Sequence, residues 1–159
     1  MSSQVFTQQA SALDAWARLL RGHAAARRAL STQLEAEHGL TINGYEALLD
    51  LAHAEDCRLK RVELARRLVL TASGVTRLLD GLEEDGYVER DSCATDRRVT
   101  YAVLTDDGRK KLEEASESHL SAVRDFFEER FSDAELDQLA ELLGRLPGAA
   151  EARGVDCSP

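Results

Sequence analysis

The strongest constraint on the fold is a change in the spacing of apolar residues after Gly86. Before that residue, apolar side chains recur every three or four positions, which is the spacing of amphipathic α-helices. After it, residues 87–90 and 99–104 are rich in β-branched and aromatic side chains, which favours strands. The polar segment 91–98 between them predicts a hairpin with a long tip. The chain is therefore expected to be mainly α-helical with one small β-hairpin.

Sequence signals also mark where the predicted helices begin and end. Three threonines and one serine stand where a helix cap is expected, and glycine or proline follows several of the predicted helix ends. The segments expected to be helical are residues 11–38, 41–53, 60–67, 71–86, 105–130 and 132–147, with Thr41, Thr71, Thr105 and Ser132 as caps. No internal repeat is expected.

Length and composition favour one folded domain. The chain has 159 residues, 43% of them hydrophobic and 31% charged, which is ordinary globular usage. No run approaches the roughly 18 apolar residues of a membrane span, and residues 1–10 lack the features of a signal peptide, so a cytoplasmic protein without membrane contact is expected. Cys57, Cys93 and Cys157 are expected to be reduced thiols, and residues 149–159 to form a disordered tail.

The net charge of −9 disfavours nucleic acid as a partner only if it is spread evenly. It is not, because residues 57–78 hold six basic and one acidic side chain, a local charge of +5. Residues 92–111 hold five basic and three acidic side chains, a local charge of +2. A local basic face is what phosphate binding requires. The alternative is a solvated surface on which charges cluster by chance.

Two short helices, a tight turn, a helix with one apolar side and a hairpin follow one another in the order of a winged helix-turn-helix. Residues 63–90 (ELARRLVLTASGVTRLLDGLEEDGYVER) and 96–108 (DRRVTYAVLTDDG) resemble the multiple-antibiotic-resistance regulator (MarR) family of transcription factors. The second segment is the more specific signal, because the family's wing signature falls on Asp96, Arg98, Leu104, Thr105 and Gly108. Similarity in helix order extends from about residue 11 to residue 146.

The resemblance implies a winged helix-turn-helix with terminal dimerisation helices. Residues 41–104 would form the lobe that binds double-stranded DNA, and residues 1–40 with 105–148 would form the helical region of a homodimer. The apolar surface available for the dimer comes from Leu13, Leu20, Leu136, Leu139, Leu143 and Leu146. The alternative is that these helices only complete the core of one chain. Family members are transcription regulators, most often repressors.

The fourth predicted helix separates apolar from polar side chains. Its expected core positions are Val75, Leu78, Leu79 and Leu82. The opposite side, near the amino end, then carries the candidate DNA contacts Thr71, Ser73, Thr76 and Arg77. This helix end has unpaired amide donors and a positive dipole, which suit phosphates and base edges. Because residues 83–85 are all acidic, only the first half of the helix is expected to enter the major groove.

The predicted hairpin tip carries Arg97 and Arg98, whose guanidinium groups suit a narrow minor groove. The family resemblance favours Arg98 as the inserted residue. Asp96 cannot attract DNA by its charge, so its expected role is to pair with an arginine and orient the wing. The alternative is an ordinary solvated turn.

Three positions depart from the expected pattern or leave a question open. Val69 stands where many helix-turn-helix segments have a turn glycine, and Gly81 stands where the family often has a basic residue. Gly74 costs about 1 kcal/mol inside a helix relative to alanine. It serves either a close approach to DNA or packing within the chain.

The resemblance also implies a small, aromatic and anionic ligand between the dimer helices and the winged lobe, which would release the protein from its operator. The candidate ligand-binding residues are Trp16, Arg18, His23 and Tyr45, since aromatic and cationic groups suit a phenolic carboxylate. For each of them the alternative is a solvated side chain or a core aromatic residue.

Three rival functions stay open. Oxidation of Cys93, beside Arg90 and the tip arginines, or of Cys57 would make a thiol-responsive repressor, although peroxide-sensing relatives carry their cysteine near the start of the first helix. A winged helix that binds only protein is a second alternative. An enzyme is the third, but the sequence has no nucleophile motif, glycine-rich phosphate loop or metal-ligand spacing beyond His53 and Cys57. No cofactor, metal site or catalytic residue is therefore expected.

Overall fold

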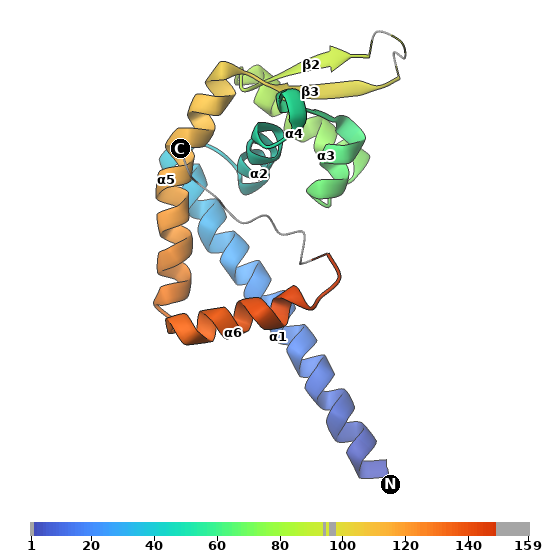
Figure 1. Ribbon diagram of the computed structural model, residues 1–159, viewed down its shortest axis with the longest axis vertical. Helices are drawn as coiled ribbons and strands as arrows, with labels where there is room; N and C mark the ends of the chain where they lie inside the picture. Colours follow the sequence, from blue (N-terminus) through green and yellow to red (C-terminus); the bar gives the residue numbers. More distant parts are fainter. Residues whose placement is uncertain (1, 94, 96–97, 149–159) are drawn as a thin grey trace. The chain divides into compact units, whose positions relative to one another are not determined.

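The computed structural model describes residues 2–93, 95 and 98–148, with side chains from residue 11 onward. The elements are α1 (Ser2–His38), α2 (Ile42–Ala52), η1 (Glu55–Cys57), β1 (Arg58–Lys60), α3 (Arg61–Arg67), α4 (Ala72–Glu84), β2 (Val88–Ser92), β3 (Thr100–Leu104), α5 (Asp106–Glu128) and α6 (Asp133–Gly144) (Figure 1). The predicted fold, mainly α-helical with a small wing, is confirmed. The chain divides after residue 120 into two compact units.

Three helices of the first unit begin with the same cap. In each, a threonine hydroxyl accepts a hydrogen bond from the backbone N–H of a glycine three residues later, which satisfies one of the free donors of a helix start. The N···O distances are 3.1 Å for Thr41 and Gly44, 3.0 Å for Thr71 and Gly74, and 3.0 Å for Thr105 and Gly108. The predicted capping roles of the three threonines are confirmed.

Two of these glycines are explained by neighbours within the chain. A Cβ atom on Gly108 would stand 2.1 Å from the backbone oxygen of Tyr87, so only glycine fits there. A Cβ atom on Gly74 would stand 3.1 Å from the Thr71 hydroxyl oxygen and 3.7 Å from the Leu70 Cβ atom. Gly74 was expected to serve either a close approach to DNA or packing within the chain. The structure gives a direct physical reason for the second role.

Residues 41–50 (TINGYEALLD) and 71–80 (TASGVTRLLD) are two versions of one helix start. They share the capping threonine, the glycine and a closing Leu-Leu-Asp, and they begin α2 and α4. The likeness is confined to these ten residues of each helix start and is not a repeated structural unit, and the side chains between the shared positions differ in polarity.

The sheet has three antiparallel strands in the order β1-β3-β2, not the two strands of a simple hairpin. Strands β2 and β3 pair from Val88 opposite Leu104 to Ser92 opposite Thr100. Strand β1 adds to the other side of β3, with Leu59 opposite Ala102. The sequence did not indicate β1, because three residues are too short for an alternating pattern and their pairing partner lies some forty residues away.

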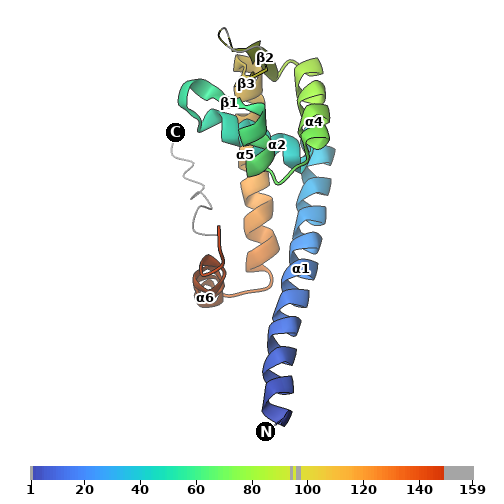
Figure 2. The same cartoon turned by 90° about the vertical axis from the view of Figure 1, so that its right-hand side faces the viewer.

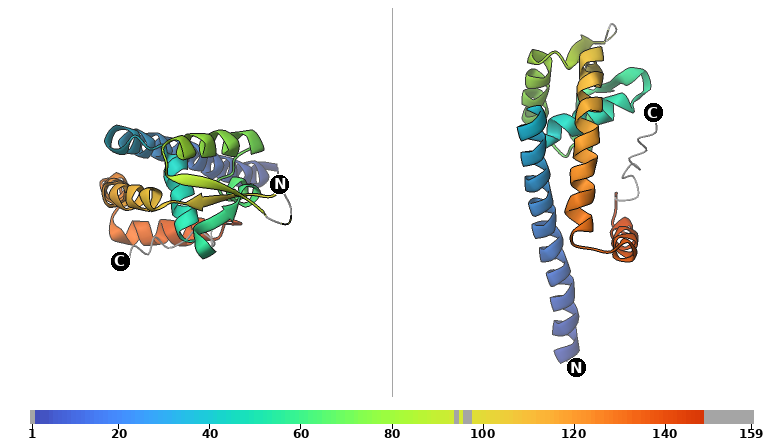
Figure 3. Two further views of the ribbon diagram at one scale, coloured as in Figure 1. Left: turned by 90° about the horizontal axis from the view of Figure 1, so that it is seen from above. Right: turned by 90° about the vertical axis from the view of Figure 1, so that its left-hand side faces the viewer.

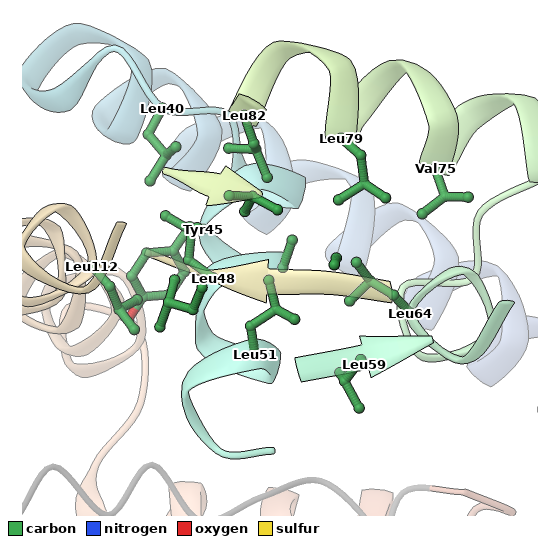
Figure 4. Close-up of a cluster of buried hydrophobic side chains, with 14 of the residues drawn as sticks. Leu40, Tyr45, Leu48, Leu51, Leu59, Leu64, Val75, Leu79, Leu82 and Leu112 are labelled. Carbon is green, nitrogen blue, oxygen red and sulfur yellow. The ribbon is translucent and has the colours of Figure 1, made fainter. Parts of the chain in front are cut away.

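One hydrophobic core joins the winged lobe to the end of α1 (Figure 4). It combines leucines from α1, α2, α3 and α4 with the inner face of the sheet. Side chains that are fully buried include Leu34, Leu48, Leu51, Leu64, Val75, Leu79 and Val88. The sheet therefore has one covered face, with Ala102 and Leu104 turned inward. This core positions α4 beside the wing, as Figure 3 shows from above.

A polar junction joins α1 and α2 to the first part of α5, which runs beside α1 (Figure 2). The Ser118 hydroxyl lies 3.2 Å from Gln33 Nε2 and 2.7 Å from His38 Nε2. His119, only 7% exposed, packs its ring 4.6 Å from that of Tyr45. Burial, and secondarily the nearby His38, lower the pKa of His119 below its usual 6.5. The buried imidazole is therefore held in its neutral form.

The second unit holds the end of α5 and the helix α6. As the sequence predicts, Ser132 and Glu135 cap α6, because the Glu135 carboxylate accepts bonds from the Ser132 backbone N–H and hydroxyl at 2.9 Å. These bonds lower the pKa of Glu135. Leu142, Leu143 and Leu146 are exposed within this unit. They give this unit an apolar side.

Several predicted boundaries shift. The first helix starts at Ser2 rather than residue 11, and the third at Arg61 rather than residue 60. The hairpin strands are Val88–Ser92 and Thr100–Leu104. The predicted disordered tail, 149–159, lies outside the described residues, and the division into dimerisation region and DNA-binding lobe stays a prediction. None of the helices in the described part of the chain is long and apolar enough to cross a membrane.

Candidate nucleic-acid interface

The turn between α3 and α4 has helix-turn-helix geometry. The backbone N–H of Val69 donates to Arg66 O at 3.3 Å, and that of Leu70 donates to Ala65 O at 2.9 Å. Val69 has a φ of 54°, and its side chain is 90% exposed. The turn therefore contains a residue in the left-handed backbone conformation that usually favours glycine. Here valine adopts this conformation, at a cost in backbone energy.

The helix α4 presents the expected two sides. Three of its predicted core residues are buried and the fourth is half-buried; they are Val75, Leu79 and Leu82, and Leu78. Its other side, near the amino end, carries the predicted contacts, of which Thr71, Ser73 and Arg77 are exposed and Thr76 is half-buried. The structure therefore brings these four predicted residues onto one accessible side of the helix.

Three of the four candidate contacts already have hydrogen-bond partners within the chain. The Thr71 hydroxyl caps the helix and lies 3.2 Å from the Ser73 hydroxyl. The Thr76 hydroxyl donates to the Ala72 carbonyl at 2.8 Å and accepts from Arg61 Nη1 at 3.3 Å. Arg77 makes no hydrogen bond or ion pair with the described residues, so its guanidinium is available for a phosphate or a base.

The carboxyl half of α4 is tied to the wing. Arg90, on β2, forms ion pairs with Asp80 and with Glu83, the latter at 3.2 Å. The acidic end of the helix, expected only to repel DNA, is therefore partly neutralised by a strand residue. Sequence reasoning missed this role. The available signal was the alternation of β2, which puts Arg90 on the same face as buried Val88.

The wing is described in part. Arg98 is exposed just before β3, as a groove-inserting residue must be. Asp96 and Arg97, the predicted orienting residue and second tip arginine, lie outside the described residues. Their roles stay predictions.

The basic segment 57–78 is less available than its charge suggests. Glu63 accepts from Arg66 at 2.9 Å and from Arg67 at 2.8 Å, and Arg67 also lies 3.9 Å from Asp50. These bonds lower the pKa of Glu63 to about 2, so the carboxylate is charged at any physiological pH. Two of the six basic residues are therefore paired with a carboxylate on α3. Much of the remaining evidence for DNA binding comes from the exposed side of α4.

The structure does not bring the four candidate ligand-binding residues together. Trp16, Arg18 and His23 are exposed on α1, where Arg18 pairs with Asp14 at 2.7 Å. Tyr45 is buried and packs on His119. The stretch of α1 that meets α2 includes Arg27, which contacts Asn43 and Glu46 and lies about 16 Å along the helix from Trp16. Within one chain, Tyr45 is therefore a core aromatic residue, which was its stated alternative.

An open groove of about 880 Å³ lies between η1, β1, α3 and the base of the wing. It is lined by side chains of both charges, among them Arg58, Lys60 and Asp91. Arg58 stacks on the Tyr101 ring at 4.0 Å and pairs with Asp91 at 3.3 Å. None of the four candidate ligand residues lines this groove.

The two described cysteines differ in their surroundings. Cys57 has a left-handed backbone with φ of 53°, and its Sγ atom lies 2.8 Å from Arg109 Nη2. Cys93 Sγ lies 3.1 Å from the Thr95 hydroxyl, while Arg90 pairs with carboxylates of α4. Among the described side chains, no three His, Cys, Asp or Glu residues form a group that could hold a metal ion.

Comparisons with known proteins agree with this geometry. A sequence profile of the MarR family matches residues 40–100. The chain is 37% identical over 111 residues to the HTH-type transcriptional repressor YetL of Bacillus subtilis (strain 168), a match that spans 70% of this chain and 66% of that repressor.

Two solved structures share the fold. Sco3205, a MarR family transcriptional regulator from Streptomyces coelicolor solved in complex with DNA, has a TM-score of 0.75 and 28% identity, covering 84% of this chain and 83% of that one. CouR from Rhodococcus jostii RHA1, bound to p-coumaroyl-CoA, has a TM-score of 0.64 and 25% identity, covering 79% of this chain and 86% of that one.

Proposed function

Because this chain belongs to the MarR family of transcription regulators, we propose that it is a homodimeric repressor that binds a pseudo-palindromic operator. A small aromatic, anionic molecule releases it from that DNA. The observation that carries the proposal is the accessible side of α4, where Ser73 and Arg77 point away from a core formed by Val75, Leu79 and Leu82. A helix held by its apolar side, with donors and a cation on the other, suits the major groove.

The wing supplies the second contact. Arg98 is exposed at the end of the hairpin loop, where a guanidinium suits the negative potential of the minor groove. The similarity to Sco3205, which was solved with DNA, supports this assignment. The similarity to the repressor YetL supports repression over activation.

Exposed apolar residues support a homodimer. On α1, Leu13 is 66% exposed, Trp16 58% and Leu20 48%, and these residues recur at helical spacing along one side. A large apolar side left open on a folded chain marks an interaction surface. In a two-fold dimer the two copies of α4 would stand about 34 Å apart, one turn of DNA. Sedimentation equilibrium should therefore report twice the mass of one chain.

The ligand assignment rests on chemistry and on one relative. CouR was solved with p-coumaroyl-CoA, an aromatic thioester with a highly anionic carrier. The side of α1 that bears Trp16, Arg18 and His23 offers an aromatic ring and cationic groups. Because these residues are exposed within one chain, a ligand site built on them needs a second surface from the dimer.

DNA binding is tested by fluorescence anisotropy with a labelled duplex from the region upstream of the protein's own gene. Log affinity should fall steeply between about 50 and 200 mM salt, because binding releases counterions. Arg98→Ala should weaken binding at least about tenfold, which is roughly the loss of one charge-assisted contact. Arg124→Ala removes an equal charge from an exposed position on α5, outside both basic segments, and serves as the control. A flat salt dependence would support the protein-binding alternative instead.

Ligand release is tested on the same duplex with p-coumarate and p-coumaroyl-CoA. Either compound should lower DNA affinity about 5- to 150-fold, the usual range of coupling between two sites. Arg18→Ala should blunt this response and leave DNA binding intact. Trp16→Ala should blunt it too, and its mass in sedimentation equilibrium shows whether the dimer is kept, because Trp16 lies on the apolar side of α1. A response to neither compound would refute the proposed inducer class.

One contact favours a second candidate for the regulatory input. Cys57 Sγ lies 2.8 Å from Arg109 Nη2, so a guanidinium stands directly beside this thiol. If oxidation is the signal, peroxide should weaken operator binding by the wild-type protein and leave Cys57→Ser unaffected. A Cys93→Ser variant distinguishes the two described thiols.

A further inference from the structure

We propose that Arg90 is a positioning residue that braces the wing against the recognition helix α4. By holding these two parts at a set angle, it lets them enter adjacent grooves of one DNA duplex. The inference rests on the proposed DNA-binding function and adds a residue that resemblance and composition did not single out. It is carried by the placement of Arg90 in β2 and by its two partners on α4.

The alternation of β2 aims Arg90 at α4. Successive side chains of a strand point to opposite faces, so Val88 and Arg90 share one face and Glu89 takes the other. Val88 is fully buried, and Arg90 pairs in register with buried Ala102. Arg90 therefore stands on the inner face of the sheet, at the point where the core gives way to solvent.

The guanidinium of Arg90 reaches two carboxylates that lie about one turn apart on α4. It pairs with Asp80 through Nη2 and with Glu83 through Nε at 3.2 Å. The planar guanidinium can bind two acceptors at once in a defined orientation, which a lysine cannot do. The Arg90 side chain is 30% exposed, whereas those of Asp80 and Glu83 are 50% and 45% exposed, so these ion pairs lie at the surface and a modest effect is expected from each.

A second anchor lies at the connection between α4 and β2. The Thr105 hydroxyl donates to the Gly86 carbonyl at 2.7 Å, and the Thr105 N–H donates to Tyr87 O at 3.1 Å. Gly108 packs directly against the same Tyr87 oxygen. This anchor, the pairing of β3 with β1 and the burial of Val88 hold the base of the hairpin against the core. Arg90, roughly 10 Å further along the chain, adds a contact between the hairpin and α4 beyond that base.

The alternative is that Arg90 binds a phosphate directly. The two roles predict opposite effects when the partner carboxylates are neutralised by Asp80→Asn and Glu83→Gln together. If Arg90 is a brace, the loss of its partners weakens DNA binding, although two negative charges have left the interface. If Arg90 binds phosphate, the same change strengthens binding, because it frees a cation and removes repulsion.

The experiment uses the full chain and a duplex enriched from a random library by the wild-type protein. Arg90→Gln and the double carboxylate variant should each bind that duplex about fivefold more weakly, in line with the loss of two surface ion pairs. Arg90→Lys, which keeps the charge but not the two-acceptor geometry, should fall between. Arg124→Gln is the charge-matched control, because Arg124 is exposed on α5 and lies outside both basic segments, and it should bind like the wild type.

Two further readouts separate positioning from general damage. In an Arg90→Gln background, Arg98→Ala should cost less affinity than it does alone, because a misdirected wing has already lost that contact. In the DNA-free protein, amide hydrogen exchange in β2 should be several-fold faster in both brace variants, with α2 unchanged.

The outcomes are distinct. Equal or tighter binding by the double carboxylate variant, or unchanged exchange in β2, would overturn the brace and leave the proposed function standing. If the wild-type protein enriches no duplex, the proposed function fails, and the exchange of β2 still decides whether Arg90 holds the hairpin.

Discussion

Residues 41–50 and 71–80 start two helices with the same cap and the same closing Leu-Leu-Asp, yet the two helices have different surroundings. In α2, the residue six positions after the threonine is Ala47, which has no exposed surface. In α4, the matching residue is exposed Arg77. The cap therefore determines where each helix begins, and the residues between the shared positions determine whether its second side is covered by protein or left for a partner.

The shared aspartates extend the comparison. Asp50 lies 3.9 Å from Arg67 of α3, and Asp80 pairs with Arg90 of β2. In both helices the same position ties the helix to a later element of the chain. The partner differs, because α2 is surrounded by helices and strands, whereas α4 lies at the edge of the lobe beside the wing.

The largest expected effect comes from exchanging the matched residues. Ala47→Arg should destabilise the fold by more than about 3 kcal/mol, because it forces a long charged side chain into a filled core. Arg77→Ala should change stability by less than about 0.5 kcal/mol while weakening duplex binding. Urea denaturation and duplex titration of both variants measure this. A stable Ala47→Arg protein would show that α2 is not the covered counterpart of α4.

A glycine series tests how each helix start is packed. Gly108→Ala places a Cβ atom 2.1 Å from a backbone oxygen and should cost about 3 kcal/mol or more, since backbone must move. Gly74→Ala meets only the Thr71 hydroxyl at 3.1 Å and should stay within about 1 kcal/mol of the wild type, because the better helix propensity offsets the contact.

Gly81 completes the series, because nothing lies within 4 Å of an added Cβ atom there. Gly81→Ala should therefore stabilise the chain by about 0.5 to 1 kcal/mol. Thermal denaturation should rank the three variants in this order. Equal effects at positions 108 and 81 would contradict the close contact with Tyr87.

The stability of the packing around α2 should also depend on pH, in a way that the packing of α4 does not. Tyr45 of α2 packs on His119, whose pKa is lowered below 6.5 by burial and, secondarily, by His38. As the pH falls, the unfolded chain takes up this proton first. The resulting stability is full above about pH 6.5 and is lost as the pH falls toward the lowered pKa.

The urea midpoint should therefore decline more steeply between pH 8 and 5 in the wild type than in His119→Gln. This range of about three pH units spans the usual pKa of histidine. His23→Gln is the matched control, because His23 is exposed on α1. Parallel curves for His119→Gln and the wild type would show that the junction does not keep His119 neutral.

A small gain in stability is expected at the turn that leads into α4. Val69→Gly should stabilise the protein by about 1 kcal/mol, because glycine takes a φ of 54° without the strain that a β-branched side chain suffers. Val69→Ala retains the Cβ atom and should recover less. The turn before α2 already has glycine in this conformation, at Gly39 with φ of 64°, so no similar gain is available there.

Sequence reasoning succeeded where the signal is local. The caps at Thr41, Thr71 and Thr105 were predictable, because a hydroxyl can reach the N–H three residues on without help from the rest of the chain. The two sides of α4 were predictable from the spacing of its leucines, because a helix repeats every 3.6 residues whatever surrounds it. The family resemblance predicted the winged helix-turn-helix fold, while the role of Arg98 stays a prediction.

It failed where a residue acts through a partner distant in the chain. Tyr45 and Trp16 both suited an aromatic ligand by type, but only Tyr45 is enclosed by α5. Strand β1 exists because β3 pairs with it, and its three residues carry no period of their own. Arg58 counted toward the basic segment 57–78 until the structure placed Asp91 of β2 against it, 3.3 Å away.

The sequence by itself determined where the helices begin, which side of α4 is apolar and which family the lobe belongs to, because each depends on neighbours within a few residues or on a motif read in order. Only the tertiary structure decided that Arg90 joins the wing to α4, that Gly108 must be glycine and that His119 is kept neutral. Those properties arise from atoms that are far apart in the chain and meet only after folding, so no local pattern encodes them.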